Sequence, residues 1–137
     1  MHIHYISEQN SILNHFLAQL RNVNIQKDSM RFRKNIERIG EIMAYELSKT
    51  LPYQEVAVQT PLGIKNTTTI KDNVVLCSIL RAGLALHTGF MNFFVFFENG
   101  FVSASRIHAV KGEVSEIKVE YQAAPSFNGK HLLLLDP

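Results

Sequence analysis

Residues 74–83 read VVLCSILRAG, and this stretch decides the fold. The run Val74–Leu80 is almost continuously apolar and has the length of one strand. Such a run, without a polar residue at every second position, is typical of a strand buried on both faces of a parallel sheet. Arg81 and Gly83 then open a turn, and the helical pattern of residues 84–94 follows. Strand, turn and helix in this order predict an α/β protein.

The last residues of the chain, HLLLLDP, predict a second buried parallel strand. We therefore expect Val74–Leu80 and Leu132–Leu135 to lie in one mainly parallel sheet. In open sheets of this kind, ligands bind beyond the carboxyl ends of the strands. Asp136 follows the last strand directly, so it lies where such a site is expected.

Two β-hairpins are predicted in addition. Residues 55–70 alternate in polarity and carry Pro61 and Gly63 at their centre. Residues 100–110 and 114–122 predict two strands joined by the tight turn KGE.

Two helices are predicted before the sheet. The first runs from Ser11 to Arg21, where the apolar residues fall on one face. The second runs from Met30 to Lys49, with Asp28 or Ser29 as its N-cap. The charged residues of the second helix predict a solvated face; they are Arg33, Lys34, Glu37, Arg38 and Glu41.

The composition excludes several classes of protein. Lys and Arg number 14 and Asp and Glu 12, and a net charge of +2 is too small to indicate nucleic-acid binding. One cysteine, Cys77, excludes an intrachain disulfide and favours a reducing compartment. The N-terminus lacks the basic start and apolar run of a signal peptide, and no stretch is long enough to span a membrane. We expect a cytoplasmic protein with no membrane partner.

Three positions carry candidate binding chemistry. Arg81, with Ala82 and Gly83, precedes a helix whose N-terminus offers free N–H groups, so phosphate or pyrophosphate is the ligand class that fits. Asp136 can accept hydrogen bonds from ribose hydroxyls or support a bound Mg²⁺. Arg106 can reach the same polyanion if its strand lies beside that of Arg81. An arginine at a strand end is as often only a surface charge.

Other chemistry-bearing residues are interpreted as structural. Cys77 is expected to be buried and inert because no histidine is near it in sequence. His2 and His4 alternate on a strand-like stretch, and two histidines make no metal site. Six of the nine phenylalanines fall between Phe90 and Phe101, which favours a helix packed on a sheet over a partner interface.

Several motifs in the same order resemble uracil phosphoribosyltransferases. The resemblance covers nearly the whole chain, from Ser11 to Pro137. It is carried by RFR at Arg31–Arg33, AYE at Ala44–Glu46, ILRAGL at Ile79–Leu84, FVSASR at Phe101–Arg106, VEYQAAPSFNGK at Val119–Lys130 and LLLLDP at Leu132–Pro137. Each motif alone is weak, and six in order are specific.

The resemblance implies a type I phosphoribosyltransferase-like α/β fold with an N-terminal helical extension and a β-hairpin arm. It implies transfer of ribose phosphate from 5-phosphoribosyl 1-pyrophosphate to uracil, giving UMP and pyrophosphate, with Mg²⁺ as cofactor, GTP as an effector and a homodimer or higher oligomer. It assigns Arg81, Ala82, Gly83 and Arg106 to the phosphoribosyl pyrophosphate. Asp136 and Pro137 are assigned to the start of the phosphoribosyl-binding loop, and no residue is assigned as acid, base or direct metal ligand.

The sequence departs from the family pattern at two places. Ser105 stands where the family usually has a tyrosine, and residues 107–113 lack the usual basic and aromatic pattern. In the family, Asp136–Pro137 precedes a Gly-rich loop that holds the 5-phosphate and a segment that recognises uracil. We therefore expect residues 1–137 to be one incomplete domain that forms no UMP alone.

Two other functions remain open at this point. The first is a non-catalytic module that keeps a dimer surface, made by the hairpin around Lys111 and Gly112 or by the Phe-rich segment. The second is a pyrimidine-responsive RNA-binding regulator on the same core. The low net charge speaks against the regulator.

Overall fold

The computed structural model describes residues 3–71, 73–107 and 116–137. Their regular elements are a 3₁₀ turn at Ile6–Glu8, the helices α1 (Ile12–Arg21), α2 (Ser29–Ser48) and α3 (Leu84–Phe93), and the strands β1 (Tyr53–Thr60), β2 (Gly63–Ile70), β3 (Val74–Leu80), β4 (Glu98–Ile107), β5 (Glu116–Ala123) and β6 (His131–Leu135).

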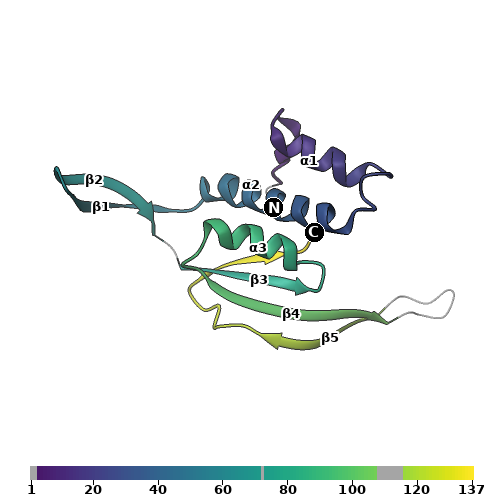
Figure 1. The fold of residues 1–137 in the computed structure, drawn as a ribbon. Helices are drawn as coiled ribbons and strands as arrows, with labels where there is room; N and C mark the ends of the chain where they lie inside the picture. The colour runs from purple at the N-terminus through teal and green to yellow at the C-terminus, as the bar shows by residue number, and fades with distance from the viewer. Residues whose placement is uncertain (1–2, 72, 108–115) are drawn as a thin grey trace.

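The main sheet is mixed, with the strand order β5-β4-β3-β6 (Figure 1). β3 pairs in parallel with β4 on one side and with β6 on the other, so that Val75 lies beside both Glu98 and Leu132. β5 returns antiparallel to β4. The prediction that residues 74–80 and 132–135 form parallel strands of one sheet is confirmed, as is the α/β class.

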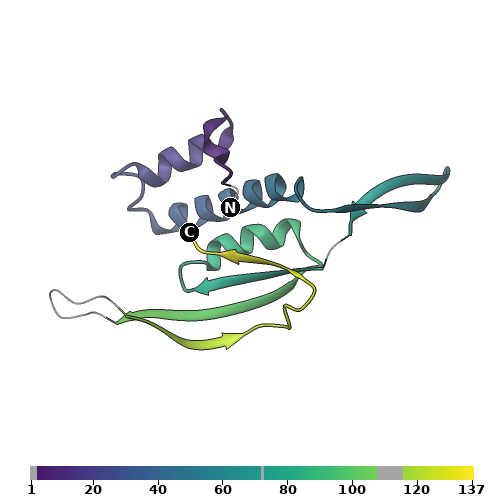
Figure 2. The same ribbon diagram turned by 180° about the vertical axis from the view of Figure 1, so that it is seen from behind.

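One face of this sheet is covered by α3, and α2 packs on α3 from outside (Figures 1 and 2). The buried core joins all three layers. Its members are Ala44 of α2, Leu86 and Phe90 of α3, Phe94 just after it, Leu76 of β3 and Leu135 of β6. α2 therefore belongs to the same core as the sheet, whereas α1 packs on α2.

Both N-terminal helices begin as their sequences predict. The Ser11 side chain accepts a hydrogen bond from the Leu13 backbone N–H at 3.3 Å. The Asp28 carboxylate accepts from the backbone N–H groups of Met30 and Arg31, both at 3.1 Å. Each cap satisfies N–H groups that lack a partner in the first helical turn.

The last strand is less buried than its leucines predict. Residues 74–78 of β3 are all buried, as expected. Leu132 and Leu134 of β6, however, are 45% and 58% exposed, while Leu133 and Leu135 face the helices. The prediction of a strand buried on both faces is therefore wrong for β6. β6 is an edge strand within the described residues, so its outer side chains lack the lateral neighbours that shield β3.

The first predicted hairpin is confirmed as a separate two-stranded sheet, β1–β2. It projects from the body as an arm (Figure 1). Gly63 in its turn has a φ of +129°, a conformation that favours glycine, and the neighbouring Leu62 is 100% exposed. The turn KGE predicted for the second hairpin lies outside the described residues, which end there at Ile107 and resume at Glu116 in paired strands.

The contact between α2 and α3 depends on two glycines. A Cβ on Gly40 would lie 2.7 Å from the carbonyl oxygen of Leu86. A Cβ on Gly89 would overlap the carbonyl oxygen of Glu37 and lie 2.9 Å from the nitrogen of Glu41. The two helix backbones therefore approach more closely than any side chain would allow.

We predict that Gly89→Ala lowers the free energy of unfolding by about 1–3 kcal/mol, because the added methyl group must push two backbones apart. Urea-induced unfolding measures the change. Thr88→Ala, an exposed neighbour on the same helix, is the control and should stay within about 0.5 kcal/mol of the parent. Equal losses in both variants would contradict this account of the contact.

Candidate functional site

The turn at residues 81–83 crosses the carboxyl end of β3. The backbone N–H of Gly83 donates to the Ile79 carbonyl at 2.8 Å, and the N–H of His87 donates to the Gly83 carbonyl at 2.9 Å. Gly83 is the N-cap of α3, and the Leu80–Arg81 peptide is cis. Arg81 and Ala82 are exposed, so the guanidinium stands in solvent next to the positive end of a helix.

Gly83 joins this turn to the end of β6. A Cβ at Gly83 would lie 2.8 Å from the carbonyl oxygens of both Ile79 and Leu135. The φ of Gly83 is −66°, so lack of space, and not an unusual conformation, requires glycine here. Asp136 follows Leu135 and is exposed, as is Pro137. The structure thus brings the 81–83 turn and Asp136–Pro137 together at one edge of the sheet.

Arg106 lies further along the same edge. Leu80, the last residue of β3, pairs with Ser103 of β4. Arg106 is three residues beyond Ser103, about 10 Å along the strand, and pairs with Ile117 of β5. The strands of Arg81 and Arg106 are neighbours, as expected, and β4 extends past the turn.

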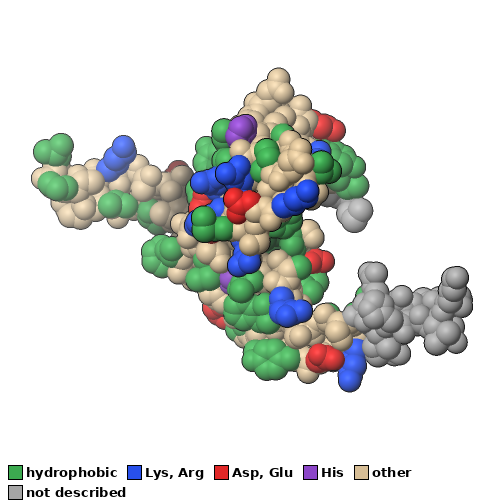
Figure 3. Space-filling view, turned by 45° about the vertical axis from the view of Figure 1, so that its right-hand side comes forward, with side chains coloured by type: hydrophobic (Ala, Val, Ile, Leu, Met, Phe, Trp, Pro, Cys, Tyr) green, Lys and Arg blue, Asp and Glu red, His purple; other side chains and the backbone are tan. Residues whose placement is uncertain are grey.

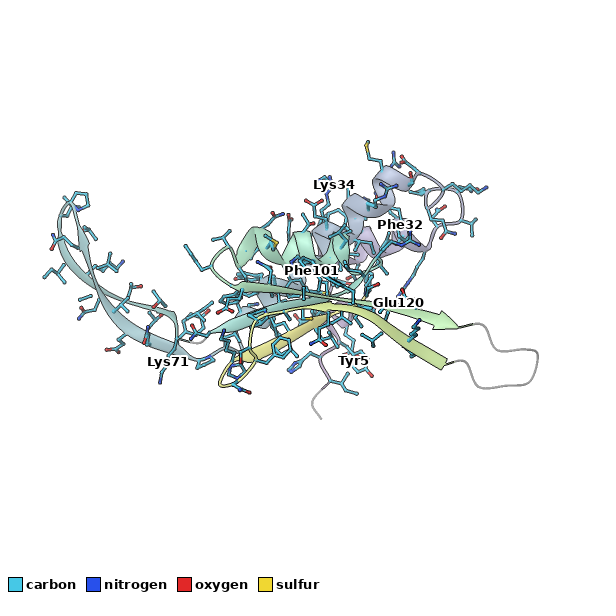
Figure 4. The ribbon with its side chains drawn as sticks, turned by 90° about the horizontal axis from the view of Figure 1, so that it is seen from below. Tyr5, Phe32, Lys34, Lys71, Phe101 and Glu120 are labelled. Carbon is cyan, nitrogen blue, oxygen red and sulfur yellow. The ribbon has the colours of Figure 1, made fainter. Side chains whose placement is uncertain are left out.

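A buried polar pair lies beneath the turn. Ser78 Oγ and His87 Nδ1 are 2.7 Å apart, and both residues are buried. The His87 ring also contacts Phe101, with 4.8 Å between the ring centroids. Phe101, labelled in Figure 4, pairs with Ser78 in the register of β3 and β4. Neither Ser78 nor His87 was singled out by sequence. The only available signal is a serine within an apolar strand, nine residues before a histidine.

Cys77, next to Ser78 on β3, is buried, as expected. Burial raises the pKa of its thiol above the ordinary cysteine value, so the neutral form is favoured at neutral pH. Nothing in the described surroundings lowers that pKa, and the thiol is not a nucleophile for this site.

The Phe-rich segment divides between the core and the surface. Phe90 and Phe94 are buried in the helix–sheet layer, as expected, but Phe96 is 94% exposed. A depression at the amino ends of β3 and β4 is lined by Ile70, Asn73, Val74, Phe93, Phe94, Phe96, Phe97 and Glu98. It lies at the opposite edge of the sheet from Arg81, so it is separate from the candidate site.

A second depression lies on the helical layer and is basic. It is lined by Asp28, Met30, Arg31, Lys34 and Arg38. Figure 3 shows Lys and Arg side chains gathered around the helices, and Figure 4 labels Lys34 there. Lys34 pairs with Glu37 at 2.8 Å, while Arg38 lies over the Phe16 ring at 5.3 Å. The predicted solvated face of α2 is thus partly engaged in side-chain contacts.

Neither a metal cluster nor a membrane span is found in the part of the chain that the structure describes. No group of three or more His, Cys, Asp or Glu side chains there is placed to hold a metal ion. No helix among those residues is long and apolar enough to cross a membrane.

Comparison with known proteins places the chain in a family. The model of the family described as uracil phosphoribosyltransferase matches residues 6–137. Uracil phosphoribosyltransferase from Porphyromonas gingivalis is 45% identical over 137 residues, which are 100% of this chain and 63% of that protein. The enzyme of the same name from Thermococcus gammatolerans is 38% identical over 112 residues, which are 80% of this chain and 49% of that protein.

A solved structure shares the fold. The AQ2163 protein from Aquifex aeolicus matches with a TM-score of 0.79 at 26% identity, covering 94% of this chain and 60% of that one. The fold is an α/β fold with a mixed sheet and N-terminal helices, and it matches a phosphoribosyltransferase-like structure in part. Within that class, the chain belongs to the uracil phosphoribosyltransferase family. It spans 63% of the length of the Porphyromonas relative.

We predict that Cys77 stays unmodified by an aromatic disulfide reagent at neutral pH while the chain is folded, and is modified rapidly in urea. Burial both excludes the reagent and raises the thiol pKa, so little thiolate forms. Absorbance of the released thiolate follows the reaction, with glutathione as the reference thiol. Rapid modification of the folded chain would contradict the placement of Cys77 in β3.

Proposed function

We propose that the 81–83 turn, Arg106 and Asp136–Pro137 form the phosphoribosyl pyrophosphate site of a uracil phosphoribosyltransferase. The reaction is that of pyrimidine salvage, from uracil and 5-phosphoribosyl 1-pyrophosphate to UMP and pyrophosphate. One observation carries the proposal: Gly83 packs against the end of β6, so an arginine and a helix N-terminus lie beside an acid at the carboxyl ends of the parallel strands β3 and β6. Family membership supports it.

Each residue has a role that follows from its charge and position. Arg81 offers a guanidinium that binds phosphate oxygens through two donors, and the turn offers the backbone N–H groups of α3. Arg106 adds a second positive charge from the neighbouring strand. As the bond between ribose and pyrophosphate breaks, negative charge grows on the leaving group, so these cations stabilise the transition state more than the ground state. The scheme needs no covalent nucleophile.

Mg²⁺ fits this site as a cofactor held mainly by the substrate. Mg²⁺ keeps several waters and is usually bound through one or two carboxylates together with substrate phosphates. Asp136 is an exposed carboxylate at the end of β6, and its oxygens can hold a ribose hydroxyl or a water of the ion. The ion would neutralise charge on pyrophosphate.

We propose this activity for a protein as long as the uracil phosphoribosyltransferases that the chain matches, of which it spans 63% in the Porphyromonas relative. By resemblance, the 5-phosphate loop and the uracil-recognition segment follow Pro137. Without them the reacting atoms are not held in attack geometry, and positioning is worth about 7–11 kcal/mol of barrier. We therefore propose UMP formation for a protein of full length and pyrophosphate binding for the residues described. A cytoplasmic location is part of the same proposal.

An effector and a partner complete the proposal. We assign the GTP effector to the depression lined by Arg31, Lys34 and Arg38, although Arg31 pairs with Asp28 and Lys34 with Glu37. The β1–β2 arm favours a homodimer, because an isolated two-stranded hairpin is marginally stable in water and its tip exposes Leu62 and Ile64.

We predict that Mg²⁺-pyrophosphate binds the 137-residue chain and that Arg81→Ala weakens this binding at least tenfold, because a charge-stabilising donor is lost. In a full-length relative, the equivalent change should cost about 2–4 kcal/mol of transition-state stabilisation. Isothermal titration calorimetry and a labelled-uracil assay measure the two effects. Arg21→Ala, at the end of α1, is the matched control. Equal affinities of the two variants would remove Arg81 from the site.

We predict a dimer or higher oligomer in solution at micromolar concentration, measured by multi-angle light scattering. Replacing the exposed apolar tip residue Leu62 by Asp should shift the population towards monomer, since a buried charge opposes association. Lys65→Asp, on the same arm, is the control for charge alone. A parent chain that is monomeric throughout would contradict the dimer.

A further inference from the structure

A polar pair without an assigned role lies directly beneath the candidate site. Ser78 and His87 are 0% and 2% exposed, and their side chains meet at 2.7 Å between β3 and α3. Their neighbours in the same layer are apolar, including Leu76, Leu86 and Phe90. Burying two polar groups in such a layer costs free energy unless they bond to each other.

Ser78 and His87 flank the 81–83 turn, one on β3 before it and one on α3 after it. Ser78 lies three residues before Arg81, and His87 lies four residues after Gly83. Between them, the backbone bonds Gly83 N–H to Ile79 O and His87 N–H to Gly83 O close the path from strand to helix. The side-chain bond therefore ties together the two elements on which the turn depends.

We propose that the Ser78–His87 hydrogen bond positions the 81–83 turn for its phosphate ligand by fixing α3 on β3. This inference rests on the proposed function, which supplies the ligand. Ser78 and His87 are positioning residues, since neither is exposed to a ligand.

The Ser78–His87 hydrogen bond differs from the surrounding apolar contacts because it depends on direction. Apolar contacts between α3 and the sheet are non-directional and tolerate small rotations or shifts of the helix. A hydrogen bond weakens steeply with distance and angle. A shift of α3 would also move Gly83, which has no free space between the carbonyl oxygens of Ile79 and Leu135. The pair and the glycine thus fix the helix start from two sides.

The surroundings favour the neutral imidazole. Burial lowers the pKa of His87, and the Asn99 side chain offsets part of that effect. The neutral ring accepts the Ser78 hydroxyl proton at Nδ1 when its own proton is on Nε2. Nε2 has no partner in hydrogen-bond geometry among the described residues, and the ring face lies on Phe101. Among the described residues, the bond to Ser78 is therefore the side-chain contact of this ring that has hydrogen-bond geometry, while Asn99 acts on the pKa of the ring.

The test uses three variants of the 137-residue chain. Ser78→Ala removes the hydroxyl, and Ser78→Thr retains it. Cys77→Ala is the matched control, because it also removes one heavy atom. Cys77 directly precedes Ser78 in β3 and is also buried, but its side chain lies on the face of the sheet away from α3.

Two measurements are made on each variant. Hydrogen exchange of the Gly83 and His87 amides, followed by nuclear magnetic resonance, reports the turn without any ligand. Calorimetric titration with Mg²⁺-pyrophosphate reports binding.

We expect Ser78→Ala to speed exchange at Gly83 and His87 relative to other α3 amides and to weaken pyrophosphate binding about fivefold, the scale of one net hydrogen bond. Ser78→Thr should restore both, and Cys77→Ala should change neither selectively. Unchanged turn exchange in Ser78→Ala, or an equal change in Cys77→Ala, would overturn the positioning role. If the parent chain binds no pyrophosphate, the proposed function fails, and amide exchange still decides whether the pair holds the turn.

Discussion

The packing of Gly83 between two backbone carbonyl groups is the constraint on which the site depends. With carbonyl oxygens of Ile79 and Leu135 both 2.8 Å from where a Cβ would be, only hydrogen fits at this position. The contact sets where α3 starts, how Arg81 leaves the strand, and how close Asp136 comes to both. Without this contact, the start of α3, the direction of Arg81 and the position of Asp136 would not be coupled to one another.

The position of α3 also explains why α2, in the N-terminal helical extension, matters to the site. α3 is held on the sheet side by Gly83 and the core, and on the outer side by α2, whose backbone meets Gly89. Cores are close-packed, so a displacement of α2 is transmitted to α3 and from there to the turn. The helical extension therefore supports the ligand edge although it contributes none of the residues assigned to that edge.

Local patterns in the sequence predicted most of the fold, and tertiary neighbours decided the rest. The apolar run of β3, the helix start near Ser11, the cap Asp28 and the hairpin at Pro61–Gly63 are short-range signals, and each is confirmed. The exposure of Leu134 depends on which strands flank β6, and the Ser78–His87 bond depends on how α3 packs across β3. Neither the exposure of Leu134 nor the Ser78–His87 bond can be predicted from local sequence patterns. The candidate ligand residues Arg81 and Asp136 were found because strand ends are readable from sequence.

The charges at the carboxyl ends of the strands indicate which part of the proposed substrates these residues bind. The candidate residues in this chain are two arginines, a helix N-terminus and one carboxylate, which suit a pyrophosphate, a ribose hydroxyl and a hydrated Mg²⁺. Recognition of a flat, neutral base requires instead a concave wall with hydrogen-bonding groups at fixed positions. At the described carboxyl ends of β3 and β6, Arg81 and Asp136 are charged and exposed, and the outer leucines of β6 are open to solvent. In the proposed reaction, then, these residues suit the pyrophosphate leaving group rather than the base.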